Sequence, residues 1–131
     1  MSPNKTIGIL GGGQLAKMLA TAAADLGFLV NIYCPDTDCP ATLVANEIVF
    51  GNYEDNENLV AFAKNVDVLT YEFENIDIKT LEELDLFVNI RPSVKALKIS
   101  QDRLTEKRYL NSLGIKTTLF YKINEVSEIE K

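Results

Sequence analysis

The chain has 131 residues, of which 47% are hydrophobic and 24% are charged, and it carries a formal net charge of −6 with no histidine. This length allows one domain with a substantial core and excludes two domains of ordinary size. The negative net charge argues against a protein that binds nucleic acids generally, since such a protein needs a basic face. No uninterrupted apolar run is long enough to cross a membrane. No signal-peptide pattern precedes the first apolar segment, so a cytoplasmic location is expected.

An apolar run, a triple glycine and a helical pattern stand at the start of the chain. Residues 6–10 predict a strand, residues 11–13 a tight turn and residues 14–26 a helix. The apolar residues that give this helix its spacing, and hence its expected buried face, are Leu15, Met18, Leu19, Ala22 and Leu26. A bare glycine backbone followed by helix N–H groups predicts a site for phosphate or another anion.

The remaining elements alternate between strands and helices. Strands are predicted at residues 28–33, 47–50, 66–71 and 86–90, with a short helical turn at 41–46. Helices are predicted around residues 59–63, 78–84, 92–99 and 100–113, followed by an extended segment at 117–123 and the opening of a helix at 125–131. This alternation predicts an α/β fold: a Rossmann-like, open, mostly parallel sheet with flanking helices. Ligands of such sheets bind at the carboxyl ends of the strands, in the loops after residues 10, 33, 50 and 71.

The glycine turn matches a loose dinucleotide-binding pattern, with Gly11, Gly13 and Ala16 at the required spacing. Alone this pattern is weak, because close packing of a strand against a helix also selects glycine. NAD binding further requires an acidic residue at the end of the second strand. That strand ends in Cys34 and Pro35, with Asp36 slightly beyond. A stand-alone NAD- or nucleotide-binding module is therefore the alternative hypothesis.

Cys34 and Cys39 are the two cysteines of the chain. Without histidine or further cysteines they cannot form a four-ligand zinc site or a catalytic Cys–His pair. Two free thiols in a reducing compartment are favoured. A disulfide between them is the other geometric option.

Glu72 and Glu74 follow the predicted strand at residues 66–71 and share one face if the chain is extended there. Two carboxylates at the carboxyl edge of a parallel sheet can accept hydrogen bonds from hydroxyls or amines, or contact a metal. A solvated acidic loop explains the pattern equally well.

Residues 100–103 predict the start of a helix, with Ser100 as its N-cap and Asp102 complementing the helix dipole. Arg103 is unfavourably placed for the dipole, which points to an anion such as a nucleotide phosphate. On the residues alone, however, an exposed arginine paired with Glu106 is the favoured explanation.

Three segments together resemble a known family. They are residues 7–19, with Gly-Gly-Gly-Gln-Leu and the later Met18 and Leu19; residues 67–76, with Tyr-Glu-Phe-Glu-Asn; and residues 91–115, with Arg-Pro-Ser, Gln-Asp-Arg and Leu-Gly-Ile. In order and spacing they resemble the N-terminal part of the N5-carboxyaminoimidazole ribonucleotide synthetases, which are ATP-grasp enzymes of purine biosynthesis. The resemblance covers essentially the whole chain.

The resemblance implies a reaction. These enzymes use ATP, Mg²⁺ and bicarbonate to carboxylate the amino group of 5-aminoimidazole ribonucleotide through carboxyphosphate. It also implies that Gly12, Gly13, Gln14, Leu15, Glu72 and Glu74 line the ribonucleotide pocket and that Arg103 contacts ATP. Residues 1–115 would form the pre-ATP-grasp domain and residues 116–131 the start of the central ATP-grasp region.

The chain stops at Lys131, where the family's central domain begins. The family's later lysines and magnesium-binding carboxylates are absent, so no catalytic or metal-binding residue and no tightly bound cofactor is expected in this chain. We expect it to be inactive alone, as a fragment or a truncated product; a ligand-free remnant serving in assembly is a third hypothesis. Full-length enzymes of the family are often homodimers, which makes a second copy of the chain one candidate partner and leaves the oligomeric state of this chain open. Apolar residues from Thr117 onward are expected to be exposed and either mobile or engaged in self-association.

Overall fold

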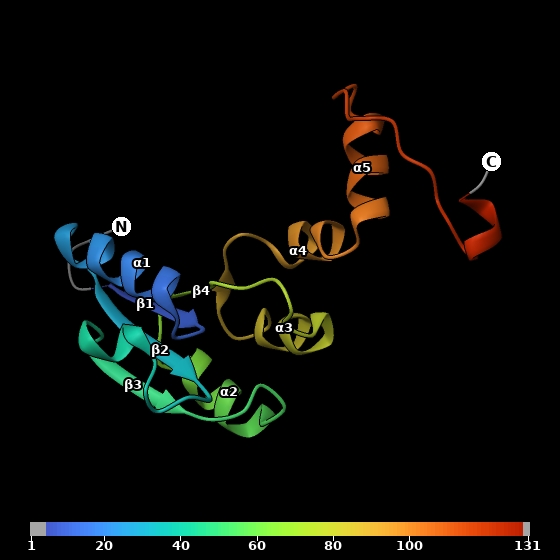
Figure 1. Ribbon diagram of the computed structural model, residues 1–131. Helices are drawn as coiled ribbons and strands as arrows, with labels where there is room; N and C mark the ends of the chain where they lie inside the picture. Colours follow the sequence, from blue (N-terminus) through green and yellow to red (C-terminus); the bar gives the residue numbers. More distant parts are fainter. Residues whose placement is uncertain (1–4, 130–131) are drawn as a thin grey trace.

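Short apolar segments of the chain form a five-stranded parallel sheet in the computed structural model, which describes residues 5–129. The sheet order is β3-β2-β1-β4-β5, and each neighbouring pair is parallel (Figure 1). The strands are β1 (Thr6–Leu10), β2 (Leu29–Cys34), β3 (Glu47–Phe50), β4 (Val68–Tyr71) and β5 (Asn89–Ile90). The predicted α/β fold class is confirmed, although β5 is shorter than the expected strand at residues 86–90.

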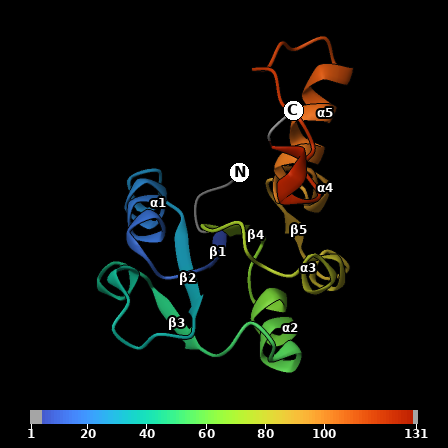
Figure 2. The ribbon, with the colours of Figure 1, turned by 45° about the vertical axis from the view of Figure 1, so that its right-hand side comes forward.

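Helices cover both faces of this sheet, as Figure 2 shows. One face carries α1 (Gln14–Asp25) and the 3₁₀ turn η1 (Pro40–Leu43). The other face carries α2 (Asn56–Lys64), α3 (Ile78–Leu84) and α4 (Val94–Ser100). The chain then continues into α5 (Arg103–Ser112) and the 3₁₀ turn η2 (Val126–Glu128), which extend away from the sheet (Figure 1). Within residues 5–129, every helix is too short or too polar to cross a membrane.

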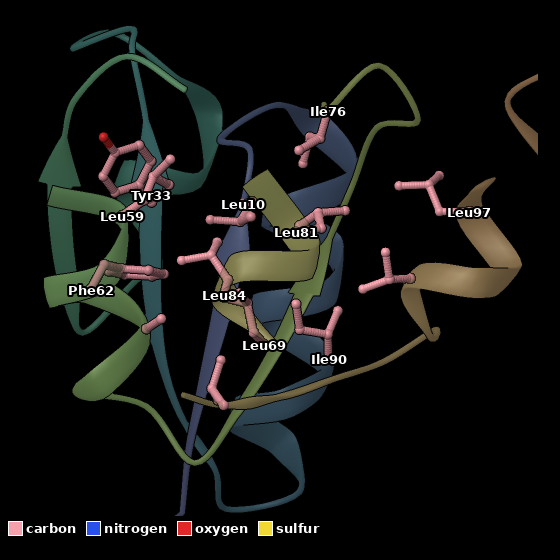
Figure 3. Close-up of a cluster of buried hydrophobic side chains, with 13 residues drawn as sticks. Leu10, Tyr33, Leu59, Phe62, Leu69, Ile76, Leu81, Leu84, Ile90 and Leu97 are labelled. Carbon is pink, nitrogen blue, oxygen red and sulfur yellow. The ribbon is translucent and has the colours of Figure 1, made fainter. Parts of the chain in front are cut away.

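Two apolar cores result, because successive residues of a strand point to opposite faces of a sheet. Ile9 of β1 packs against the alanines of α1, whereas its neighbour Leu10 belongs to the larger core under α2, α3 and α4. Figure 3 shows this larger core, to which Leu10 of β1 and Leu84 of α3 both belong. Burying each such leucine contributes about 2 kcal/mol.

Helix α1 packs through small residues, which corrects the buried face predicted from the sequence. Its buried side chains are Ala16, Ala20 and Ala23, whereas Leu15 and Met18 are each 59% exposed. Leu19, Ala22 and Leu26 also face outward. The alanine stripe lets the helix lie close to the sheet, so the larger side chains at neighbouring helical positions remain on the surface.

The start of α5 also differs from the prediction. Ser100 does not cap this helix: it is the last residue of α4, where its hydroxyl donates to the Leu97 carbonyl. The N-cap is Asp102, whose Oδ1 accepts a hydrogen bond from the Thr105 N–H at 2.7 Å. This hydrogen bond lowers the pKa of the Asp102 carboxyl. An aspartate whose side chain closes the first turn therefore begins the helix two residues later than expected.

The segment after α5 has little regular structure. Gly114 follows the helix with φ of +78°, a left-handed conformation that commonly ends helices. Residues 117–123 form no strand, and the helix expected from residue 125 is a single 3₁₀ turn as far as residue 129; residues 130 and 131 lie outside the described part. Leu119 is 91% exposed, which confirms the predicted exposure of apolar side chains there.

Asp67 joins the start of β4 to β1 and makes stability depend on pH. Its carboxylate pairs with Lys5 and accepts the Thr6 N–H at 2.8 Å, and these hydrogen bonds lower its pKa. A lowered pKa stabilises the fold above the unfolded-state value of about 3.9, and this contribution disappears as pH falls through the folded-state value. We expect Asp67→Asn to reduce the loss of unfolding free energy between pH 6 and pH 3 in urea titrations. An unchanged pH dependence would contradict this role.

Candidate functional site

The chain reverses its winding direction at β1, which lies between β2 and β4 in the sheet. From β1 the chain runs through α1 to β2 and β3 on one side, and it returns to β4 and β5 on the other. Crevices at such switch points, outside the carboxyl ends of the strands, are the usual ligand sites of open α/β sheets. The glycine turn follows β1, and the loop that begins with Glu72 follows β4. The Glu72 N–H donates to the Leu10 carbonyl at 3.0 Å, which aligns the two loops.

The carboxylate of Glu72 binds the N-terminus of α1. Its two oxygens accept hydrogen bonds from the N–H groups of Gly13, at 2.8 Å, and Ala16, at 2.6 Å. A carboxylate in this position also interacts favourably with the helix dipole. The prediction that the turn presents free N–H groups to an external anion is therefore wrong for these two groups, because a carboxylate of the chain itself occupies them.

The triple glycine is explained by what surrounds it. Gly11 has φ of +111°, and a Cβ atom there would lie 2.3 Å from Cγ of Glu72. A Cβ on Gly13 would lie 2.8 Å from Oε1 of Glu72. A Cβ on Gly12 would meet Sγ of Cys39 at 2.3 Å and Sγ of Cys34 at 2.8 Å. Each glycine therefore makes room for a side chain from another part of the chain, which is the close-packing explanation of the pattern.

Polar groups and an apolar hollow remain open beside Glu72. Among the hydrogen bonds of residues 5–129, none uses the N–H groups of Gln14 and Leu15 at the first positions of α1. A shallow hollow next to them is lined by Leu15, Met18, Leu19, Tyr71 and Glu72. Each carboxylate oxygen of Glu72 keeps a second lone pair, so it can also accept a hydrogen bond from a hydroxyl or an amine in this hollow. The arrangement suits a ligand with a flat apolar part and several polar groups.

Glu74 does not join Glu72 on the helix N-terminus. Its side chain is exposed, while its carbonyl accepts a hydrogen bond from Nε2 of Gln101 at 2.6 Å. The same Nε2 atom donates to the Ile76 carbonyl at 2.8 Å. Gln101 thus ties the loop after β4 to the connection between α4 and α5. Sequence reasoning assigned no role to Gln101; only its position two residues before Arg103 could have suggested one.

Arg103 begins α5, close to the loop that Gln101 holds. Its guanidinium donates to Oε2 of Glu106 at 2.6 Å, and this bond raises its pKa further. The alternative of an exposed arginine paired with Glu106 is thus present in the structure, with the Arg103 side chain 81% exposed. A surface concavity joins Arg103 to Lys107, whose ammonium lies 5.4 Å from the centre of the Phe120 ring, and to Lys122. Three cations beside an aromatic ring suit an anionic ligand with a flat ring.

An aromatic group that the sequence analysis missed lies near Glu72. The Tyr53 ring is 5.0 Å from the Phe73 ring and 6.0 Å from the Tyr33 ring, measured between centroids. Burial, followed by the negative charge of neighbours that include Glu72, raises the pKa of Tyr53. Tyr53 therefore stays a neutral phenol at physiological pH.

The geometry gives no support for NAD binding. The end of β2, where a ribose-binding acidic residue would be needed, is buried, and Asp36 accepts the Asp38 N–H at 2.9 Å within its own turn.

Residues 5–129 contain no group of three or more acidic or cysteine side chains arranged to hold a metal ion.

Comparison with known proteins gives a consistent result. Residues 4–101 match the model of the ribonucleotide synthetase preATP-grasp domain. The chain is 44% identical over 130 residues to a bifunctional purine synthesis protein, purC/E, of Dictyostelium discoideum. It is 43% identical over 126 residues to the N5-carboxyaminoimidazole ribonucleotide synthase of Staphylococcus aureus. These matches cover 99% and 96% of this chain, but 13% and 34% of the two relatives.

Solved structures agree with this result. The ADP complex of the S. aureus N5-carboxyaminoimidazole synthetase superposes with a TM-score of 0.91 at 41% identity, covering 99% of this chain and 35% of that one. The synthase of Aspergillus clavatus, in complex with ADP and 5-aminoimidazole ribonucleotide, gives a TM-score of 0.79 at 35% identity, covering 88% and 31%. The chain thus spans about a third of these synthases. It belongs to the ribonucleotide synthetase preATP-grasp domain family.

Proposed function

We propose that this chain is the N-terminal domain of an ATP-dependent ligase that converts 5-aminoimidazole ribonucleotide and bicarbonate to N5-carboxyaminoimidazole ribonucleotide in de novo purine biosynthesis. The observation that carries the proposal is the Glu72 carboxylate held on the N–H groups of Gly13 and Ala16 at the switch point of the sheet. Relatives that carry the name of this synthase match almost the whole chain, and one related structure contains the ribonucleotide.

The ribonucleotide, in this proposal, binds beside the glycine turn. Glu72 accepts hydrogen bonds from ribose hydroxyls or from the amine that becomes carboxylated, while its own position is set by α1. The phosphate approaches Gly12, Gly13 and the open N–H groups of Gln14 and Leu15, where the positive end of the helix dipole favours an anion. The imidazole ring fits the apolar hollow next to Leu15. Glu74 lines the outer edge of this pocket.

ATP, in this proposal, meets the chain at Arg103. A phosphate group of ATP replaces the Glu106 carboxylate as the partner of the Arg103 guanidinium. Lys107 and Lys122 add positive charge beside it. Because Gln101 holds the loop after β4, the ribonucleotide side and the ATP side are connected through one amide. Mg²⁺, which neutralises developing charge during phosphoryl transfer, finds no cluster of ligands among residues 5–129.

The metal and most of the ATP site are therefore expected outside this chain. Residues 1–115 then form the pre-ATP-grasp domain, and residues 116–131 open the central ATP-grasp region. We expect no turnover from the chain alone, a homodimer in the complete enzyme, and a cytoplasmic setting, since ATP and a ribonucleotide phosphate do not cross membranes unaided.

A chimeric enzyme tests this proposal. The part of this chain that matches the S. aureus synthase over 126 residues replaces the corresponding segment of that enzyme, and ADP formation is measured with and without 5-aminoimidazole ribonucleotide. We expect ribonucleotide-dependent ATP hydrolysis within about tenfold of the parent enzyme. Glu72→Gln in the chimera should lower kcat/KM for the ribonucleotide by at least about tenfold, the effect of one lost charged hydrogen bond.

The matched control is Glu57→Gln, which changes an exposed carboxylate in the first turn of α2. It should leave kcat/KM within about twofold of the chimera. A chimera that folds and binds ADP, yet hydrolyses ATP without regard to the ribonucleotide, would overturn the proposal. Saturable NAD binding by the 131-residue chain itself would favour the dinucleotide-binding alternative.

A further inference from the structure

The two cysteines of the chain lie in contact at the carboxyl edge of the sheet. Cys34 ends β2, and Cys39 directly precedes η1. Their Sγ atoms are 2.7 Å apart, and the side chains are 1% and 6% exposed. Residues 35–38 form an exposed turn between them, closed by the hydrogen bond from the Asp38 N–H to Asp36. The two thiols therefore already face one another at a short distance within one small segment of the chain.

Both cysteines border the glycine turn. Gly12 packs against the two sulfur atoms, since a Cβ on it would collide with each of them. The Gly11 N–H donates to the carbonyl of Tyr33, next to Cys34, at 2.8 Å. The Gly12 carbonyl accepts the N–H of Ala41, two residues after Cys39, at 2.9 Å. The glycine turn, whose Gly13 N–H binds the Glu72 carboxylate, is therefore hydrogen-bonded to both segments that a disulfide would join.

We propose that Cys34 and Cys39 form a reversible dithiol–disulfide site, with a small-molecule disulfide such as oxidised glutathione as the oxidant. Oxidation joins the end of β2 to the start of η1 and fixes both against Gly12. The site is independent of the proposed ligase activity, because it depends only on the two thiols and their packing.

The exchange proceeds in two steps. The Cys39 thiolate attacks one sulfur of glutathione disulfide, the bond between the two glutathione sulfurs breaks, and one glutathione leaves and takes up a proton. Cys34 then loses its proton, and its sulfur attacks the Cys39 sulfur; a bond forms between Cys34 and Cys39 as the second glutathione leaves. Two protein thiols are oxidised, and one glutathione disulfide is reduced to two glutathione thiols.

Burial assigns the first attack to Cys39. Desolvation, reinforced by the hydrogen bond with Cys39, raises the pKa of the Cys34 thiol to about 12. A thiol with so high a pKa contains little of the thiolate that attacks a disulfide. Cys39 is the more exposed of the two buried cysteines, and it directly follows the exposed turn formed by residues 35–38.

Redox titration of the full 131-residue chain tests the site. The chain is equilibrated in buffers with increasing ratios of oxidised to reduced glutathione, quenched with acid, alkylated under denaturing conditions and weighed by mass spectrometry. We expect the monomer to lose both alkylatable thiols and the mass of two hydrogen atoms, and dithiothreitol to reverse the change fully. The wild-type titration alone decides the proposal. A chain that keeps both thiols at every ratio, or that forms only intermolecular dimers or a stable mixed disulfide, would overturn it.

Two alanine variants test the order of attack. Cys34→Ala should retain one glutathionyl group at Cys39, because no second thiol can displace it. Cys39→Ala should gain this group much more slowly, since Cys34 is buried with a high pKa. Faster modification of Cys39→Ala than of Cys34→Ala would overturn the assignment of Cys39 as the attacking thiol.

Discussion

Glu72→Gln should lower the free energy of unfolding of this chain by about 2 kcal/mol, the cost of one lost hydrogen bond to a charged group. The carboxylate accepts the N–H groups of Gly13 and Ala16 with its two oxygens. A glutamine of the same shape offers one oxygen and one NH₂ group, so one of these N–H groups would face another donor. The negative charge at the N-terminus of α1 is lost as well. Urea unfolding followed by circular dichroism measures the change.

Glu74→Gln is the matched control, because it changes an exposed carboxylate in the same loop. It should alter the unfolding free energy by less than about 0.5 kcal/mol, as surface substitutions usually do. A Glu72→Gln chain as stable as the wild type would show that the carboxylate does not bind the helix N-terminus in solution. The slope of the urea transition should stay the same in both variants, since the surface exposed on unfolding does not change.

Local sequence patterns predict the strands and the central helices of this fold well. Strand β3 (Glu47–Phe50) and helix α3 (Ile78–Leu84) occur where hydrophobic periodicity places them. The prediction fails at α1 and at the start of α5, where two different sets of residues satisfy the same local pattern. In α1, leucines and alanines both recur at helical spacing, and only the close approach of the helix to the sheet selects the alanines as the buried face. At α5, Ser100 and Asp102 are both good caps, and the side chain of Asp102 is the one that bonds to the helix.

The candidate site could be predicted only in part, because its central contact joins residues 59 positions apart. The sequence indicates a glycine turn after one strand and two carboxylates after another, and the α/β pattern places both at the same edge. It does not show that Glu72 enters the turn while Glu74 remains outside. Nor does it show that Gly12 accommodates two sulfur atoms. Such packing depends on the register of β1 with β4 and β2, which appears only in three dimensions.

Gly11→Ala should be more damaging than Glu72→Gln, with a loss of at least about 3 kcal/mol of unfolding free energy from strain and lost hydrogen bonds. Gly11 has φ of +111°, a backbone conformation that residues with a side chain rarely adopt. The added Cβ would also lie 2.3 Å from Cγ of Glu72. Glu72 must then withdraw from Gly13 and Ala16. Gly27→Ala separates these two effects, because Gly27 has φ of +81° but no atom within 4 Å of an added Cβ. It should cost about 1 kcal/mol, from backbone strain alone.

Combining substitutions identifies the source of the excess cost. If the new methyl group acts by displacing Glu72, then Gly11→Ala should cost less in a Glu72→Ala background, where that side chain and its hydrogen bonds are already gone. The two substitutions would then be strongly non-additive, as expected for residues in contact. Urea unfolding of the four chains of this double-mutant cycle gives the interaction free energy. Strict additivity, or a cost equal to that of Gly27→Ala, would show that the glycine is needed for its backbone conformation and not to make room for Glu72.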